Sequence, residues 1–258
     1  MDYSAISFQE KDGIVRLTLN RPDSLNALNM DILADLSRAL AFVKREKGLR
    51  GLILTGQGER SFCAGADLSY FNSLEPQDYL DFIDISIEVC EGIWNMPFVT
   101  VAAINGLAMG GGCELSLACD FRIAVAEAVF ALPEINHGLL PGLGGLVFMS
   151  RMLGRAKTLE FALTGKTVTA KEALSMGMIT QIAGRETLLA EAEEYIAEIA
   201  KKGPQAIKWI KQIINEYQTS DLRKAFQHES LGVLAAFVTD DARKGLRRFL
   251  NRKTGIRD

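Results

Sequence analysis

The sequence has no strong excess of either charge and no long uninterrupted apolar run. Its formal net charge is −3 over 258 residues, so no basic field would draw nucleic acid or an anionic membrane surface. The longest apolar stretch, residues 97–109, is interrupted by Asn105 and Gly106 and is too short to span a bilayer. We therefore expect small molecules or further copies of the chain as partners, with no nucleic acid and no membrane.

Cysteine is scarce, and its positions form no recognisable pattern. The cysteines show neither CxxC spacing nor histidines at metal-ligand spacing, which argues against a metal site. They are Cys63, Cys90, Cys113 and Cys119. Residues 1–13 lack the basic start and apolar segment of a secretory signal, and they are acidic where a transit peptide would be rich in Arg. We expect reduced thiols, no metal and a cytoplasmic location.

The composition is that of an ordinary globular protein, with 48% hydrophobic and 24% charged residues. This length allows one large domain or a domain with a smaller appendage. The first half is rich in strand patterns, in which strand, strand, helix units recur, and the last third reads as helix. This order predicts an α/β core followed by a helical C-terminal region.

Local signals mark the ends of several elements. Residues 5–20 read as a hairpin, since apolar positions flank a turn at residues 11–13. Asn29 is a candidate N-cap for an amphipathic helix that runs to about residue 46. Pro76 fits the first turn of a further helix, and Thr169 with the Glu three residues later forms a plausible capping box.

The chain is organised around residues 99–138. A β-rich run enters a turn at residues 105–106, and glycines 110–112 then open a helix whose first turn carries Glu114. A second apolar run leads on to Glu134. Two glutamates in apolar surroundings beside a glycine-lined helix start are more typical of a catalytic site than of a packed core.

The glycine clusters are not nucleotide-binding fingerprints. Leu115 and Val147 stand where the last glycine of G-x-G-x-x-G would fall, and Gly-Lys-Ser/Thr is absent. The remaining interpretation is a helix start whose free NH groups bind a partial negative charge, such as a developing oxyanion, with Gly111 well placed. The alternative is that the glycines only allow close helix packing.

Several ordered motifs resemble the crotonase superfamily, and enoyl-CoA hydratases most of all. They are SFCAGAD at 61–67, NGLAMGGGCEL at 105–115, PE at 133–134 and PG at 141–142, with RPDSLNALN at 21–29 and a C-terminal signature at 244–253. The resemblance implies an α/β fold, the ClpP/crotonase-like spiral of ββα units with a helical C-terminal region. Residues 1–195 would form the core with its acyl-CoA site, and residues 196–258 a helical trimerisation region. It also implies a homotrimer, or a hexamer built as a dimer of trimers.

The same resemblance assigns roles to individual residues. The backbone NH groups of Ala66 and Gly111 would hold the thioester oxygen as it acquires enolate character. Glu114 and Glu134 would flank a water molecule; we assign Glu114 to water activation and Glu134 to protonation of the α-carbon, although the sequence does not decide the order. Gly142 would orient the water. No separate cofactor is implied, because coenzyme A is part of the substrate.

Further matched positions would contact the coenzyme A carrier. They are Leu25, Ala64, Asp67, Leu68, Phe249 and Lys253. We assign no catalytic role to His137, His228 or Cys113. After Gly145 the family commonly continues Thr-Gln-Arg-Leu, whereas this chain has Leu-Val-Phe-Met at 146–149. We therefore expect apolar groups in place of polar ones near the site, with consequences for acyl specificity.

The motifs favour hydration of a 2-enoyl-CoA to a 3-hydroxyacyl-CoA. A double-bond isomerase would need only the acid/base at Glu134, so Glu114 favours hydration without excluding isomerisation or a more specialised acyl-CoA reaction. A third possibility is a non-catalytic relative that binds RNA. The mild acidity and the lack of a Lys/Arg-rich segment argue against it.

Overall fold

The computed structural model describes residues 2–217 and 222–245. Their strands form two sheets. The larger, six-stranded sheet has the order β1 (Ile6–Lys11), β2 (Ile14–Leu19), β3 (Gly51–Gly56), β5 (Val99–Ile104), β7 (Phe121–Val125) and β10 (Gln181–Ala183). The four-stranded sheet has the order β4 (Ser61–Cys63), β6 (Leu107–Met109), β8 (Val129–Ala131) and β9 (Val168–Thr169). Pairing is parallel except for β1 with β2 and β8 with β9.

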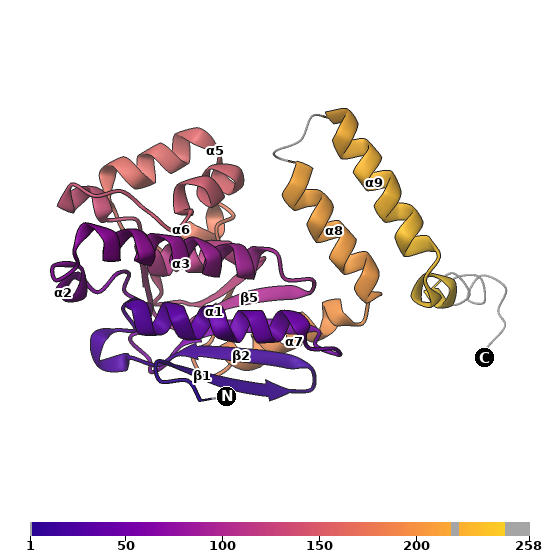
Figure 1. Ribbon diagram of the computed structural model, residues 1–258, viewed down its shortest axis with the longest axis horizontal. Coiled ribbons are helices and arrows are strands. Elements are labelled where there is room, and N and C mark those ends of the chain that lie inside the picture. The colour runs from indigo at the N-terminus through magenta and orange to yellow at the C-terminus, as the bar shows by residue number, and fades with distance from the viewer. Residues whose placement is uncertain (1, 218–221, 246–258) are drawn as a thin grey trace.

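Helices follow the strands in a regular order. They are α1 (Met30–Arg45), α2 (Leu68–Phe71), α3 (Pro76–Trp94), α4 (Gly111–Ala118), α5 (Gly145–Thr164), α6 (Ala170–Ser175), α7 (Leu188–Ala200), α8 (Pro204–Tyr217) and α9 (Leu222–Phe237), with 3₁₀ turns η1 (Pro22–Ser24) and η2 (Glu134–His137). Helices α1 and α3 lie side by side along one face (Figure 1). The strands β3 and β5 are buried at every position, as expected for parallel strands covered on both faces.

From β3 to β8, consecutive strands alternate between the two sheets, and this alternation makes the spiral. Strands β3 and β4 precede α3, β5 and β6 precede α4, and β7 and β8 precede α5. Each turn therefore contributes one strand to each sheet and one main helix. The predicted α/β spiral of ββα units is confirmed.

The local sequence signals are also confirmed. Strands β1 and β2 pair as the expected hairpin. The Asn29 Oδ1 accepts the Ile32 NH at 3.1 Å and begins α1. Pro76 lies in the first turn of α3, and Thr169 forms a complete capping box at the start of α6. These signals succeed because each depends on residues that are close together in the sequence.

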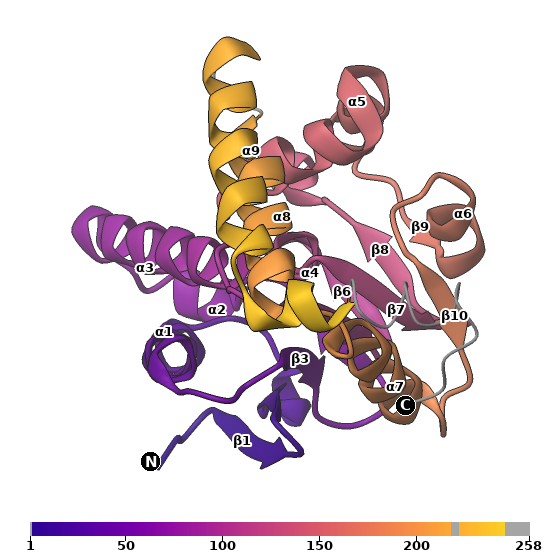
Figure 2. The ribbon, with the colours of Figure 1, turned by 90° about the vertical axis from the view of Figure 1, so that its right-hand side faces the viewer.

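Helices α8 and α9 form an antiparallel pair that projects from the rest of the protein (Figures 1 and 2). Helix α8 is attached through Lys211, whose Nζ lies 2.6 Å from Asp120 Oδ2 and 2.7 Å from the Phe98 carbonyl. Helix α7 runs across the predicted division at residues 195 and 196, and that division stays a prediction. Among the described residues, no helix combines the length and apolar character needed to cross a membrane.

Helix α4 lies in the centre of the fold, and all of its residues are buried. Its C-terminal carbonyls face the buried guanidinium of Arg122, which donates to the carbonyls of Ser116 at 3.1 Å and Cys119 at 2.8 Å. The same side chain donates through Nε to the Met178 carbonyl at 2.6 Å. A cation at this end complements the negative end of the helix dipole and fixes α4, whose N-terminus faces the candidate site.

Candidate active site

A cavity of about 230 Å³ lies where the three turns of the spiral meet. The segment after β4 contributes residues 64–66 and Leu68, the segment after β6 contributes residues 110–111 and Glu114, and the segment after β8 contributes Glu134. Seven of the predicted site residues line this cavity: Ala64, Ala66, Leu68, Gly111, Glu114, Glu134 and Gly142. The spiral thus brings together residues that are far apart in the sequence.

Glu114 is the most deeply buried acidic group in the cavity wall, with 1% of the residue exposed. Its Oε1 accepts two backbone hydrogen bonds, from the Leu143 NH at 2.8 Å and the Gly145 NH at 2.7 Å. A Cβ at Gly145 would lie only 2.4 Å from Glu114 Cγ. The start of α5 therefore holds this carboxyl group in one position, and only a glycine allows the approach.

Burial raises the pKa of Glu114 from 4.5 to about 7. The NH groups of Gly145 and Leu143 act in the opposite direction because they stabilise the carboxylate, whereas the negative charge of Glu134 raises the pKa further. A carboxyl group that titrates near neutrality can exchange protons at physiological pH. The nearby glutamate makes the two groups a coupled pair.

Glu134 begins the 3₁₀ turn η2 and is only partly buried. Its Oε2 is buried and has no hydrogen-bond partner among the described residues. Burial raises the pKa of Glu134, while its own backbone NH and the charge of His137 lower it. A Cβ at Gly110 would lie 2.7 Å from Glu134 Oε1, so this glutamate also lies against a glycine.

The backbone at Ala66 and Gly111 can supply NH donors to the same cavity. Gly111 is the first residue of α4, where an NH has no intrahelical acceptor. Ala66 pairs with Leu28 in a parallel bridge in which Leu28 NH donates to Gly65 O at 2.7 Å and Asp67 NH donates to Leu28 O at 2.9 Å. Because Leu28 bonds only the neighbours of Ala66, the Ala66 NH points away from that strand.

The two donor segments approach each other closely. A Cβ at Gly65 would lie 2.9 Å from the Met109 carbonyl oxygen, and one at Gly110 would lie 3.7 Å from Gly65 Cα. Both glycines have positive φ, +93° at Gly65 and +50° at Gly110. These positions therefore require glycine for both space and conformation, which supports close backbone approach over helix packing as the reason for the clusters.

The other predicted contact residues are distributed differently. Leu25 and Asp67 lie behind the cavity wall: the Leu25 carbonyl accepts the Ala64 NH at 3.1 Å, and Asp67 Oδ1 accepts the Tyr70 NH at 3.2 Å. Phe249 and Lys253 lie outside the described residues. His137 lines the cavity, whereas His228 lies on α9, where its Nδ1 is 2.8 Å from a Glu216 oxygen.

The apolar run at residues 146–149 differs from expectation, because none of these residues lines the cavity. The first turn of α5 directs Phe148 to Trp94, with ring centroids 4.9 Å apart. Both rings line a second, apolar cavity of about 410 Å³ beside α8. Of the residues that replace Thr-Gln-Arg-Leu, Phe148 therefore contributes to the packing beneath α8, and none belongs to the lining of the candidate site.

Sequence reasoning missed two parts of the site. The NH groups that hold Glu114 belong to Leu143 and Gly145, and only the glycine run at 142–145 hinted at them. The far wall of the cavity is an aromatic group in which Phe71 meets Phe82 edge to face at 4.7 Å and Tyr79 at 5.4 Å. The helical spacing of the α3 residues gave no sign that they face a cavity.

The spiral of ββα turns, with its glycine-lined donors beside two glutamates, is the architecture of a crotonase-fold protein. The solved structure of an enoyl-CoA hydratase from Bacillus anthracis superimposes with a TM-score of 0.92 and 33% identity, covering 96% of this chain and 97% of the other. The family profile described as enoyl-CoA hydratase/isomerase matches residues 9–255. The chain belongs to the enoyl-CoA hydratase/isomerase family of the crotonase superfamily.

Curated relatives agree over nearly the whole chain. A crotonyl-CoA hydratase from Syntrophomonas wolfei is 33% identical, with 98% of this chain and 97% of the relative covered. A short-chain-enoyl-CoA hydratase from Clostridium acetobutylicum is 31% identical, with the same shares of 98% and 97%. In both comparisons, nearly the whole of this chain aligns with nearly the whole of the relative.

Proposed function

We propose that this protein adds water across the double bond of a 2-enoyl-CoA to give a 3-hydroxyacyl-CoA. The observation that carries the proposal is a pair of glutamates, the buried Glu114 and the partly buried Glu134, that line one cavity and have raised pKa values. Hydration needs one group to take a proton from water and another to deliver one to carbon. Two carboxyl groups in different protonation states supply both functions.

The thioester oxygen would bind between the NH groups of Ala66 and Gly111. As the hydroxyl group attacks C3, the π electrons move toward C2 and the thioester oxygen, which becomes an enolate. Donors aimed at this developing charge stabilise the transition state more than the ground state. The positive end of α4 adds to the effect because Gly111 is its first residue.

The hydrogen bonds of the glutamates favour one division of labour. Glu114 accepts two NH groups through Oε1, which favours its carboxylate form and suits removal of a proton from water. Glu134 Oε2 has no partner among the described residues, so a proton there disrupts no hydrogen bond. In the addition, Glu114 gains the water proton while Glu134 gives its proton to C2. Exchange with solvent then restores both groups.

Hydration is tested by following the absorbance of the conjugated thioester of crotonyl-CoA. We expect turnover by the wild type and a loss of kcat of about 10²-fold or more in Glu114→Gln and in Glu134→Gln. The matched control is Glu46→Gln, which changes an exposed glutamate at the end of α1. Absence of hydration by the wild type, or wild-type activity in either site variant, would refute the proposal.

The assignment of roles has its own test. Exchange of the α-protons of butyryl-CoA in D₂O needs an acid/base at C2 but no water addition. We expect Glu134→Gln to abolish this exchange and Glu114→Gln to retain it. The opposite result would reverse the roles. A parallel assay with a 3-enoyl-CoA measures isomerisation, which should be slow relative to hydration.

The proposal extends to assembly and location. Six apolar side chains on α8 and α9 are each more than half exposed: Ile210, Ile214, Leu231, Val233, Leu234 and Phe237. Such a surface favours a homotrimer or a dimer of trimers, which sedimentation equilibrium would distinguish from a monomer. The free, buried cysteines are compatible with a reducing cytoplasm.

A further inference from the structure

Arg21 lies directly behind the wall that carries Ala66. Its two terminal nitrogens bind different segments: one donates to the Ala27 carbonyl at 2.7 Å, and the other donates to Asp67 Oδ2 at 3.1 Å. Ala27 precedes Leu28, and Asp67 follows Ala66. The guanidinium therefore links the two strands of the Leu28–Ala66 bridge from one side.

The turn that carries Arg21 is itself fixed by its own hydrogen bonds. The backbone NH of Arg21 donates to Asn26 Oδ1 at 3.0 Å, and the Asn26 NH donates to the Arg21 carbonyl at 2.8 Å. The Asn26 amide then donates to the Ser61 carbonyl at 2.9 Å. Arg21 thus starts from a rigid turn attached to β4, which leads into the donor segment.

The structure fixes the two proposed oxyanion donors to different degrees. Gly111 belongs to the buried helix α4, whose far end is fixed by Arg122. Ala66 lies in a loop segment and is held by the two backbone bonds of Leu28. A misplacement of about 1 Å in such a site can reduce the rate about 10²-fold. The position of Ala66 therefore depends on whatever fixes residues 27, 28 and 67 relative to one another.

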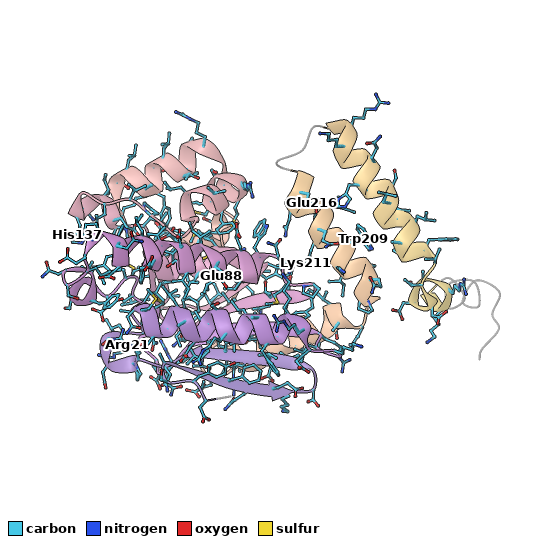
Figure 3. The ribbon with its side chains drawn as sticks, in the orientation of Figure 1. Arg21, Glu88, His137, Trp209, Lys211 and Glu216 are labelled. Carbon is cyan, nitrogen blue, oxygen red and sulfur yellow. The ribbon has the colours of Figure 1, made fainter. Side chains whose placement is uncertain are left out.

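We propose that Arg21 is a positioning residue for the Ala66 oxyanion donor, acting through its bridge between Asp67 and the Ala27 carbonyl. Figure 3 places Arg21 at the same end of the protein as His137, away from α8 and α9. It is absent from the cavity lining, so it acts through the backbone and does not touch the substrate. The proposal rests on the hydratase function proposed above.

The charge of Asp67 supports this arrangement. Burial alone would raise the pKa of Asp67, but hydrogen bonds from the Tyr70 NH and from Arg21, together with the Arg21 charge, hold it below its usual value. Its two oxygens serve different partners, since Oδ1 caps α2 and Oδ2 binds Arg21. The two nitrogens of the arginine fork reach Asp67 and the Ala27 carbonyl at the same time, a geometry that the single ammonium group of a lysine does not reproduce.

The test is Arg21→Lys, which keeps the charge and loses the fork. We expect kcat for crotonyl-CoA to fall roughly ten- to hundredfold while KM changes less than about threefold, because an oxyanion donor acts mainly in the transition state. The matched control is Arg185→Lys. Arg185 likewise binds a carbonyl, that of Glu59 at 2.8 Å, and a carboxylate, that of Glu127 at 3.1 Å, but neither partner adjoins Ala66 or Leu28 in the sequence. Its kcat should stay within about twofold of wild type.

A spectroscopic measurement separates positioning from general loss of structure. The absorption band of bound 4-dimethylaminocinnamoyl-CoA moves to longer wavelength when the thioester carbonyl is polarised. We expect a smaller shift in Arg21→Lys than in wild type and an unchanged shift in Arg185→Lys. If Arg21→Lys does not fold, Asp67→Asn removes the same bridge while keeping an acceptor for the Tyr70 NH, and it should show the same changes.

Two results would overturn the inference: a wild-type kcat in the folded variant, whether or not KM rises, or an unchanged spectral shift. Failure of the proposed function is a different result. In that case the wild type would not hydrate crotonyl-CoA, whereas the spectral shift of the bound chromophore would still report whether Arg21 controls the carbonyl site.

Discussion

Replacing Glu114 by Gln should stabilise the fold at neutral and alkaline pH while it abolishes hydration. The Glu114 carboxyl is buried, and burial raises its pKa from 4.5 to about 7 against the opposing effect of the backbone NH groups at residues 142, 143 and 145. Gln has the shape of the neutral carboxyl group, and its Oε1 can still accept from Leu143 and Gly145. The substitution therefore removes the ionisation and keeps the packing.

The sign and size of the effect follow from proton linkage. Between pH 4.5 and about pH 7 the folded protein retains a proton on Glu114 that the unfolded chain has released. The free energy of unfolding therefore falls as pH rises through this window, and it is unaffected by this group below 4.5 or above about 7. At 1.36 kcal/mol for each pKa unit, the interval corresponds to about 3 kcal/mol. The free energy of unfolding of Glu114→Gln does not fall in this way, because its side chain does not ionise.

The assay is urea unfolding of both proteins at equal concentration, in steps from about pH 4 to about pH 8, since assembly makes stability depend on concentration. We expect equal stability near pH 4 and an advantage for Glu114→Gln that grows to about 3 kcal/mol near pH 8. Glu46→Gln should show no such pH-dependent difference. A Glu114→Gln difference that is constant with pH, or a less stable variant at pH 8, would refute the reasoning.

Three further predictions concern the site and its surroundings. The pH profile of kcat/KM should be bell-shaped, because the reaction needs one carboxyl group ionised and the other protonated. Both limbs should be displaced upward from ordinary carboxyl values, since burial raises the pKa of Glu114 to about 7 and also raises that of Glu134; a flat profile from pH 5 to 9 would contradict it. Gly145→Ala should lower kcat at least about tenfold, because its Cβ would lie 2.4 Å from Glu114 Cγ, whereas Gly92→Ala, with its nearest contact at 3.5 Å, should have wild-type activity. The cysteines are all buried and burial raises their pKa values, so a thiol reagent should label none in the native protein and all after unfolding.

Features that depend on neighbouring residues could be predicted from the sequence. Asn29 caps α1, Thr169 closes a capping box, and the glycine cluster at 110–112 opens α4. The alternation of strand, strand and helix could also be recognised, because each unit is short and has its own periodicity. The family motifs then placed Glu114, Glu134 and the donor segments in one cavity.

Contacts between turns of the spiral could not be predicted in the same way. That Leu143 and Gly145 would direct their NH groups at Glu114 depends on how the start of α5 packs against α4. The bridge from Arg21 to Asp67 joins segments whose distance is set by the pairing of Leu28 with Ala66. The apolar residues at 146–149 were placed near the site because they follow its motif, but the rotation of α5 directs Phe148 elsewhere.

The spiral explains why each motif contributes one element of the site. The three strands β4, β6 and β8 lie parallel in one sheet, so their C-terminal ends meet at the same edge. The first end leads to Ala66, the second to Gly111 and Glu114, and the third to Glu134. A shift of one turn relative to the others would therefore remove one function and leave the rest in place. This makes the contacts between turns, such as the Arg21 bridge and the NH groups from α5, as important to the proposed chemistry as the glutamates themselves.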